Sequence, residues 1–304
     1  MTERYRLMEA ERGSFPVPTM ARALGVSRSG FYAWLRRPRA EAGDRWAAAR
    51  EAVRAEHEAA RGIPGARTLL ALVAPRFPGV TLYRVRRLMR ELGIRGVRPC
   101  APRRTTVPDP RAPERPDLVR RGFDRPVPTC WLVGDITYLR TGQGWLYMAV
   151  VIDLCTRMVV GCSFSERMAA DLPIAALEGA WRRGYVAGGA VFHSDRGSQY
   201  TSKAMAEWAA AHDVRLSVGR TGSCHDNAVA ESFFGTLKNE MYHLRSFATR
   251  DEARAACVGY VEGYYNRRRP HSSIGYECPA GRMEAFMRRM DEMAEREAAL
   301  PLAA

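Results

Sequence analysis

Three carboxylates stand in sequence contexts from which they could act together. Asp135 interrupts a run of apolar and β-branched residues, Asp195 ends a short apolar segment, and Glu231 lies in a segment with helical periodicity. Carboxylates gathered at one place repel each other, and hard divalent cations such as Mg²⁺ or Mn²⁺ relieve that repulsion. The pattern predicts a site with two such ions for phosphoryl transfer, one activating the attacking oxygen and one stabilising the leaving oxygen.

Each of these carboxylates, taken alone, has an ordinary structural interpretation. Asp135 could face solvent on a sheet, Asp195 could cap a loop, and Glu231 could lie on a helix surface. An unpaired charge within an apolar strand is unfavourable, however, so Asp135 needs a compensating partner. The three together, in separate elements of one domain, favour a shared site.

The segment around Glu231 predicts which side chains accompany that carboxylate. At about 100° per residue, a helix places Asn227 and Lys238 within roughly 40° of Glu231. We therefore expect an amide donor and a cation beside the carboxylate, as a metal and a phosphate side by side would require. The opposite face is apolar and predicts the buried side of the helix: Val229, Phe233, Phe234, Leu237 and Met241.

The elements that position these residues follow a recognisable order. Alternation and apolar runs predict strands at 130–139, 145–154, 158–165, 190–194 and 214–218. Helices are predicted at 171–183, 202–211, from about 226 past 237, and 251–265. This order predicts an α/β domain with a mixed five-stranded sheet and flanking helices, as in ribonuclease-H-like folds.

Positive charge is concentrated in the first part of the chain. The net charge is +14 and the isoelectric point is about 9.9. Residues 1–121 hold 26 basic and 12 acidic side chains, whereas residues 122–304 hold 21 of each. A genome rich in G and C would explain the preference for Arg but not this asymmetry. The distribution indicates a nucleic-acid-binding part joined to a neutral part with another task.

The basic part contains two helical patterns of the helix-turn-helix type. In the first, a turn at Gly25 leads to Ser27, which can cap a helix that exposes Arg28. In the second, Arg84 and Arg87 lie beside an apolar stripe and could contact phosphates, although a solvated basic face would look the same. The predicted parts are helix-turn-helix-like segments at 1–40 and 41–98, a linker at 99–124, a catalytic core at 125–285 and a helical tail at 286–304.

The cysteine content and the hydropathy of the chain indicate in which cellular compartment the protein is expected. The seven cysteines are odd in number and form no Cys-x-x-Cys pair, so we expect neither a disulfide framework nor a structural zinc site. No apolar run is long enough to span a membrane, and no signal peptide opens the chain. We therefore expect a cytoplasmic, nucleoid-associated protein without a membrane partner.

Several strings in the neutral part are specific enough to indicate a family. They are Asp135-Ile-Thr-Tyr138, His193-Ser-Asp-Arg-Gly-Ser-Gln-Tyr200, Asp226-Asn-Ala-x-x-Glu-Ser-Phe-Phe-x-x-Leu-Lys-x-Glu240 and Tyr265-Asn-x-x-Arg-Pro-His271. Thirty-five residues separate Asp195 from Glu231. The chain resembles the DDE transposases of two-reading-frame bacterial insertion sequences, the OrfB-type product, within the retroviral-integrase superfamily.

This resemblance implies roles for individual residues and an integrase core fold. It implies that Asp135, Asp195 and Glu231 bind the metals and that Lys238 contacts DNA near the cleaved end. Asn227 matches a position near the substrate. The remaining matches are expected to support the structure or form hydrogen bonds: Asp226, Asp153 and His193.

The resemblance also implies partners and leaves two other functions open. We expect binding to transposon-end and target DNA, a homo-oligomer in the synaptic complex, and cooperation with the product of an upstream reading frame. A hydrolysis-only nuclease would share the fold, and a non-catalytic DNA-binding regulator would share the basic part. Clustered carboxylates argue against a pure binding protein.

Overall fold

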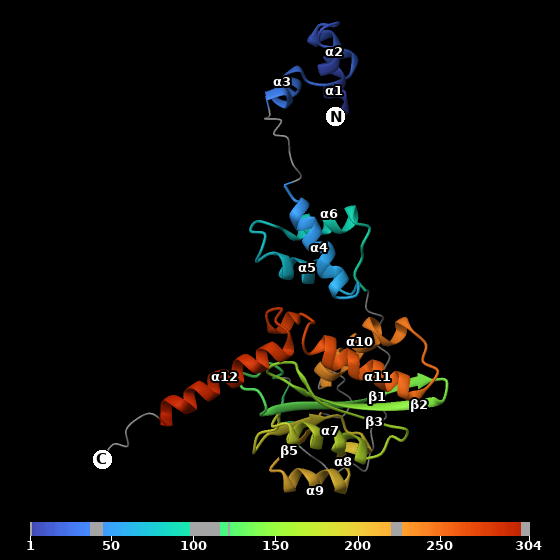
Figure 1. Ribbon diagram of the computed structural model, residues 1–304, viewed down its shortest axis with the longest axis vertical. Helices are drawn as coiled ribbons and strands as arrows, with labels where there is room; N and C mark the ends of the chain where they lie inside the picture. The colour runs from blue at the N-terminus through green and yellow to red at the C-terminus, as the bar shows by residue number, and fades with distance from the viewer. Residues whose placement is uncertain (1, 37–44, 98–115, 121, 220–226, 299–304) are drawn as a thin grey trace, which may run out of the picture. The chain divides into compact units, whose positions relative to one another are not determined.

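The computed structural model describes residues 2–36, 45–97, 116–120, 122–219 and 227–298 (Figure 1). Contacts between Cα atoms divide the chain into two compact units, Met1–Glu51 and Ala52–Ala304. Asp226, a predicted supporting residue, lies outside the described ranges. So does most of the predicted linker. Each unit is described on its own.

The first unit contains three short helices, α1 (Thr2–Ala10), α2 (Val17–Ala23) and α3 (Arg28–Arg36). The Ser27 hydroxyl accepts a hydrogen bond from the backbone N–H of Gly30, at 3.2 Å, and so caps α3 as predicted. The sequence did not predict α1, because its buried apolar face is limited to Tyr5 and Met8. The core of this first unit consists of Tyr5, Met8, Val17, Met20, Ala21 and Phe31.

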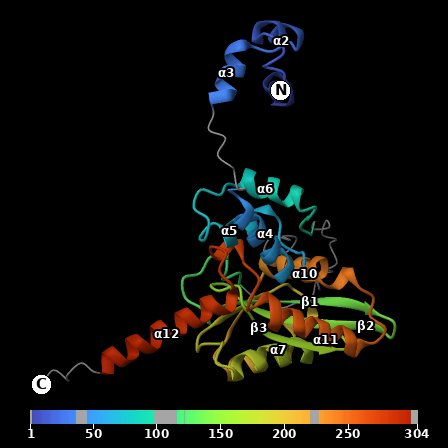
Figure 2. The ribbon, with the colours of Figure 1, turned by 45° about the horizontal axis from the view of Figure 1, so that its top comes forward.

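Helix α4 (Ala47–Ala59) crosses the boundary between the two units, and α5 (Ala66–Val73) and α6 (Leu82–Glu91) follow it in the second unit (Figure 2). The Thr81 side chain caps α6 by accepting from the N–H of Arg84. Val85, Leu88 and Met89 are buried, as the apolar stripe predicted. The arginines of α6 therefore lie on its outer side.

The predicted five-stranded mixed sheet is present, in the order β3-β2-β1-β4-β5. Antiparallel pairing joins β1 to β2 and β2 to β3, while β4 runs parallel to both β1 and β5. The strands span β1 (Trp131–Thr141), β2 (Gly144–Asp153), β3 (Val159–Ser165), β4 (Val191–Ser194) and β5 (Arg215–Val218).

Helices cover both faces of this sheet (Figure 1). One face carries α7 (Asp171–Arg182), α8 (Ser198–Thr201) and α9 (Lys203–Ala211). The other carries α10 (Ala228–Glu240) and α11 (Arg250–Tyr260), followed by a π-helical turn at Val261–Tyr265. Short 3₁₀ turns occur at Tyr242–Leu244 and Ser272–Ile274, and α12 (Pro279–Ala298) ends the described chain.

The packing against β1 depends on a glycine next to a predicted site residue. A Cβ atom at Gly134 would lie 2.3 Å from the ring of Phe192 on β4, whose centroid is 5.9 Å from that of the Tyr200 ring on α8. Glycine at this position therefore lets the aromatic ring of β4 approach the backbone of β1. The next residue along the strand is Asp135.

One further property concerns membranes. Among the described helices, none combines the length and the hydropathy that a membrane crossing would need.

Candidate active site

The parallel pairing of β1 with β4 places two of the predicted carboxylates side by side. Leu132 pairs with Phe192 and Val133 pairs with His193, in a constant register. The same register extended by two residues aligns Asp135 with Asp195, just beyond the last paired positions. Residues two apart on a strand share a face, so both aspartates follow the parity of Val133, the face on which α10 packs.

The pKa of the Asp135 carboxyl group is influenced by the other predicted site residues. It is half-buried, and its Oδ1 accepts a hydrogen bond of 2.8 Å from the backbone N–H of Ile136. Burial raises the pKa of Asp135 to about 8, and the charges of Asp195 and Glu231 add to that rise. The Lys238 ammonium opposes it. Asp135 therefore retains a proton near neutral pH unless a further cation is bound.

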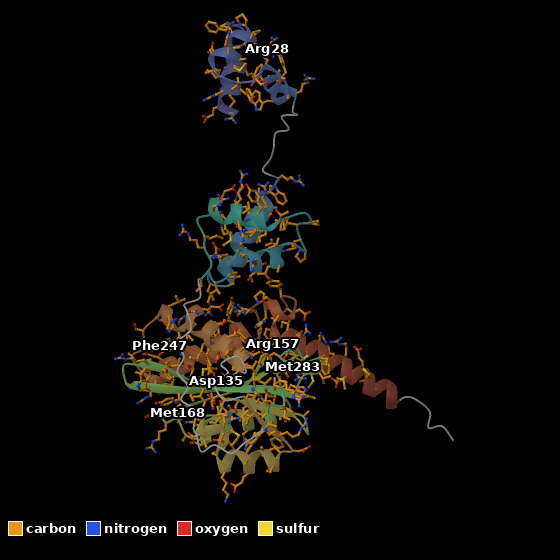
Figure 3. All side chains as sticks on the ribbon, turned by 180° about the vertical axis from the view of Figure 1, so that it is seen from behind. Arg28, Asp135, Arg157, Met168, Phe247 and Met283 are labelled. Atoms are coloured by element: carbon orange, nitrogen blue, oxygen red, sulfur yellow. The ribbon has the colours of Figure 1, made fainter. Side chains whose placement is uncertain are left out.

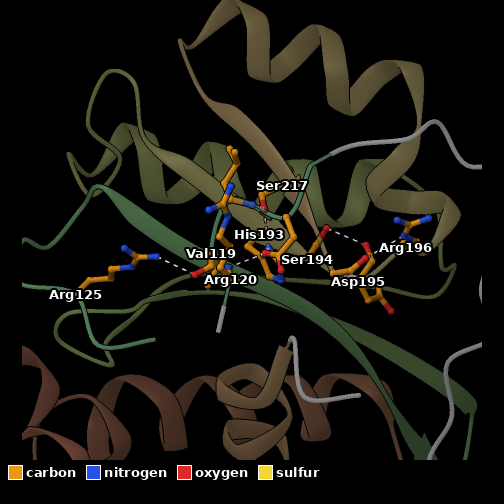
Figure 4. A network of polar contacts seen from close by, with 11 residues as sticks. Val119, Arg120, Arg125, His193, Ser194, Asp195, Arg196 and Ser217 are labelled. Carbon is orange, nitrogen blue, oxygen red and sulfur yellow. Dashed lines mark hydrogen bonds and ion pairs between the residues drawn. The ribbon is translucent and has the colours of Figure 1, made fainter. Parts of the chain in front are cut away.

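Asp195 directly follows β4, where the chain turns toward α8 (Figure 4). Its Oδ1 accepts a hydrogen bond of 3.0 Å from the backbone N–H of Gly197. The neighbouring Arg196 is held by a hydrogen bond of 3.0 Å from its Nε to the carbonyl of Gly219. These contacts fix the turn that presents the carboxylate.

The third carboxylate, Glu231, is exposed on the first turn of α10. Ala230, Phe233, Phe234 and Leu237 form the buried face of that helix, as predicted. The expectation that Asn227 shares the exposed face requires correction. Asn227 precedes the helix, is 8% exposed, and donates a hydrogen bond of 3.1 Å from Nδ2 to the carbonyl of Gly134. Its position at the N-cap, rather than within a helical turn, explains the difference.

Lys238 lies between Asp135 and an aromatic side chain of β1. It is half-buried, and burial lowers its pKa while the charge of Asp135 opposes the lowering. The Lys238 Nζ is 5.4 Å from the centroid of the Tyr138 ring. A cation is therefore held next to the carboxylates, where a phosphate could approach.

The C-terminal end of α10 is held by a half-buried ion pair that the sequence did not predict. The guanidinium group of Arg269 contacts both carboxylate oxygens of Glu240, with N–O distances of 2.8 to 3.0 Å. The hydroxyl group of Tyr260 donates to the same carboxylate at 2.6 Å. Arg269 and Glu240 belong to two of the strings that indicated the family, and this signal could have suggested the pairing.

Tyr200 is a second residue that sequence reasoning did not single out. It lies on α8 and is 2% exposed. Burial raises its pKa well above the ordinary value, and the charges of Asp135 and Asp195 add to the effect. A neutral phenol therefore packs close behind the two aspartates.

The predicted supporting residues lie inside the fold. Asp153 is fully buried and accepts hydrogen bonds of 2.7 Å from the backbone N–H groups of Thr129 and Thr156 and from the Thr156 hydroxyl. These bonds tie the turn after β2 to the start of β1. His193 is also fully buried, with Nδ1 2.8 Å from the Ser217 hydroxyl on β5 (Figure 4).

The predicted DNA-contacting arginines lie in the helical regions. Arg28 is exposed at the first position of α3 (Figure 3). Arg84 is half-buried on α6, and Arg87 is exposed with an ion pair of 2.9 Å to Glu91. Arg28 and Arg87 are thus accessible to a ligand, each on its own module.

The donor set at the three carboxylates suits a hard cation. Across the described ranges, no three His, Cys, Asp or Glu side chains stand close enough to form a ready metal cluster. All three predicted ligands nevertheless supply oxygen. The pKa of Asp135 is raised first by burial and then by the charges of Asp195 and Glu231, and a divalent cation would neutralise those charges. The residues present therefore fit Mg²⁺ or Mn²⁺ better than a metal that prefers sulfur or nitrogen ligands.

Comparison with known families covers most of the chain. Residues 126–224 and 212–279 match models of an integrase core domain, and residues 44–102 match an HTH-like domain. An uncharacterised 31 kDa protein of insertion element IS600 from Shigella sonnei is 35% identical over 88% of this chain and 98% of its own length. Among solved structures, the HTLV-2 integrase catalytic core in complex with magnesium aligns with a TM-score of 0.40 and 15% identity, over 50% of this chain and 94% of that one.

A curated relative with a named activity completes the comparison. The transposase InsF of insertion sequence IS3fB from Escherichia coli K12 is 37% identical, over 91% of this chain and 96% of its own length. The integrase core is the domain in which the sheet, α10 and the three carboxylates lie. The chain therefore belongs to the family of insertion-sequence transposases that includes InsF of the IS3 elements.

Proposed function

We propose that this transposase cleaves DNA strands at transposon ends and transfers them to target DNA, using Asp135, Asp195 and Glu231. One observation carries the proposal. The parallel register of β1 and β4, continued by two residues, would bring Asp135 opposite Asp195, and the pKa of Asp135 rises to about 8, first through burial and then through the charges of Asp195 and Glu231. The part of this rise that comes from the other carboxylates supports ligands that share cations.

Mg²⁺ or Mn²⁺, as a pair of ions, would be held by these three carboxylates. When bound, the ions would supply Lewis-acid stabilisation of the attacking and leaving oxygens of a phosphodiester. Other residues of the chain hold these ligands in position. Asn227 fixes the start of α10 against β1, and Arg269 fixes its end through Glu240, so Glu231 and Lys238 are held in place. Lys238 would contact a phosphate close to the cleaved bond.

The basic helical regions would supply DNA affinity. Arg28, Arg84 and Arg87 are proposed to contact DNA phosphates, and the excess of positive charge in residues 1–121 supports this proposal. A synaptic complex holds two transposon ends together, so we propose a homo-oligomer there. The product of an upstream reading frame is proposed as a further partner, and the location as cytoplasmic and nucleoid-associated.

The test is a strand-transfer assay with a labelled transposon end carrying a 3′-hydroxyl group, in the presence of Mg²⁺. Asp135→Asn, Asp195→Asn and Glu231→Gln should each abolish the joined product while DNA binding is retained. Asp171→Asn, an exposed position at the start of α7, serves as the matched control and should leave the product unchanged. Full activity in any one of the three site variants would refute its assignment.

The same assay separates the two alternatives. A hydrolysis-only nuclease would give cleaved ends without joined product, and a regulator would bind DNA without changing it. Loss of DNA binding in all three variants would indicate that the carboxylates serve the structure rather than the chemistry.

A further inference from the structure

Two aromatic side chains are exposed together on the β1–β2 hairpin. Tyr138 is 36% exposed and Trp145 is 46% exposed. Their ring centroids are 5.3 Å apart and the ring planes meet at 83°. In the strand register, Tyr138 lies opposite Tyr147 and Arg140 lies opposite Trp145, so the two exposed rings are diagonal neighbours on one face of the sheet.

Lys238 connects this aromatic pair with the proposed catalytic carboxylates. Tyr138 is three residues beyond Asp135 on the same strand, so the two side chains project from opposite faces of the sheet. The Lys238 Nζ is 5.4 Å from the Tyr138 ring centroid, and the Lys238 and Asp135 charges affect each other's pKa. The ammonium group therefore links the carboxylates on one side with the aromatic rings on the other.

The surroundings of the pair favour a polyanion. Arg140 is exposed directly opposite Trp145, on the same face. Arg250 donates a hydrogen bond of 3.1 Å to the Trp145 carbonyl and also pairs with Glu166 at 3.2 Å, so its charge is partly compensated. Lys238 and Arg140 thus flank the rings with positive charge, as in sites that hold a nucleic-acid backbone while its bases stack.

We propose that Tyr138 and Trp145 stack against an unpaired base of the DNA, next to the phosphate that the carboxylates act upon. The proposal rests on the proposed function, because that function brings DNA to this surface. In a duplex the faces of the bases are covered by their neighbours, and only the edges are open in the grooves. An exposed pair of rings therefore suits bases that have left the stack, as at a frayed or cleaved end.

The test compares two forms of one transposon end, a blunt duplex and the same duplex with a short unpaired 3′ end. Affinity of the full chain is measured by fluorescence anisotropy with EDTA present, so that no reaction occurs. The wild-type protein should prefer the unpaired end. Trp145→Ala should weaken binding of that end by about tenfold and leave blunt-duplex binding unchanged. Trp145→Phe, which retains a ring, should keep most of the preference.

The chain offers a matched control in Trp181, which is 43% exposed on α7 and contacts His212. Trp181→Ala should leave both affinities unchanged. A second measurement uses 2-aminopurine placed in the unpaired end, whose fluorescence should be quenched by the wild-type protein and by Trp181→Ala but not by Trp145→Ala. Thermal denaturation of each variant shows whether the fold is retained, and Trp145→Phe tests stacking even if the alanine variant is unstable.

Three results would overturn the proposal. The first is that Trp145→Ala keeps the wild-type preference for the unpaired end. The second is that it loses affinity equally for both DNA forms, which would indicate a contact with duplex DNA. The third is that oligomer size changes while the preference does not, which would indicate a protein interface. Failure of the proposed function gives a different result. Absence of strand transfer by the wild-type protein, with the stacking effect intact, would leave a site for unpaired DNA without the catalytic role.

Discussion

The side-chain amide of Asn227 donates a hydrogen bond of 3.1 Å to the carbonyl group of Gly134, the residue immediately before Asp135. This bond joins the start of the helix that carries Glu231 to the strand that carries Asp135. Glu231 lies four positions after Asn227, about one helical turn. The distance between two of the proposed ligands is therefore controlled by a residue that need not touch either of them.

Replacement of Asn227 by Asp should disturb this link without changing the size of the side chain. Aspartate cannot donate to the Gly134 carbonyl, so we expect a loss of about 1–3 kcal/mol in the free energy of unfolding. Strand transfer should fall further, by about a hundredfold, since small misplacements of reacting groups are costly. Urea denaturation and the strand-transfer assay measure the two effects. Wild-type activity in Asn227→Asp would show that the link does not position Glu231.

The ion pair between Arg269 and Glu240 predicts a second effect on α10. Arg269→Ala leaves the Glu240 carboxylate, which is 10% exposed, without its cation but still bonded to the Tyr260 hydroxyl. This change should lower the free energy of unfolding by about 3 kcal/mol. Arg269→Lys retains the charge but loses the paired geometry, so its loss should be smaller. Combining Arg269→Met with Glu240→Met should recover much of the stability. Equal stability of all these variants would contradict a role for the pair.

The raised pKa of Asp135 predicts how pH affects stability in the absence of divalent cations. The pKa is 3.8 ordinarily and about 8 in the folded protein. Between these values the folded state holds a proton that the unfolded state has released, so stability from this group is full below pH 3.8 and is lost as pH rises toward 8. Asp135→Asn should therefore lose less stability than the wild-type protein between pH 5 and pH 8.

Thermal denaturation of the two proteins across this pH range provides the measurement. Mg²⁺ should raise the melting temperature of the wild-type protein at pH 8, because it neutralises the ionised carboxyl group. It should have a smaller effect on Asp135→Asn. Identical pH profiles for the two proteins would mean that Asp135 titrates near its ordinary value.

Arg28 should contribute to DNA affinity through a phosphate contact. Arg28→Ala should weaken binding of all DNA sequences to a similar extent and reduce the slope of log K against log salt by about 1. Arg182→Ala is a suitable control, because Arg182 lies on α7 and pairs with Glu178 at 2.6 Å. Titrations at several salt concentrations test this. An unchanged slope in Arg28→Ala would remove Arg28 from the DNA interface.

The strands and most helices could be predicted because they depend on local patterns. Bulky apolar runs separated by turns marked the five strands, and Ser27 and Thr81 marked two helix starts. The helix α8 was missed because its four residues are too few to show a period. The alignment of Asp135 with Asp195 depends on parallel pairing between distant strands, which no local pattern reveals.

The residue types of the candidate site could be predicted from the sequence, but the residues that hold them in position could not. Asn227 was expected to lie within the helix beside Glu231 and Lys238, whereas α10 begins at Ala228 and Asn227 is its N-cap residue. Tyr200 and the pair of Arg269 with Glu240 were not foreseen, since their roles arise from burial and from contacts across 20 residues or more. Sequence strings therefore identified the residues that act, and folding determined the residues that hold them.

The shortness of β4 has a consequence for self-association. Because β4 ends at Ser194, no strand among the described residues pairs with β1 beyond Val133 on that side, and such an edge invites pairing with a strand of another molecule. Alternate residues direct their backbone groups to this edge. Side chains occupy several of these groups: Asn227 at the Gly134 carbonyl, Asp135 at the Ile136 N–H, and Tyr242 at the Arg140 carbonyl. These bonds reduce the capacity of the edge for intermolecular β-sheet growth, and hence for aggregation.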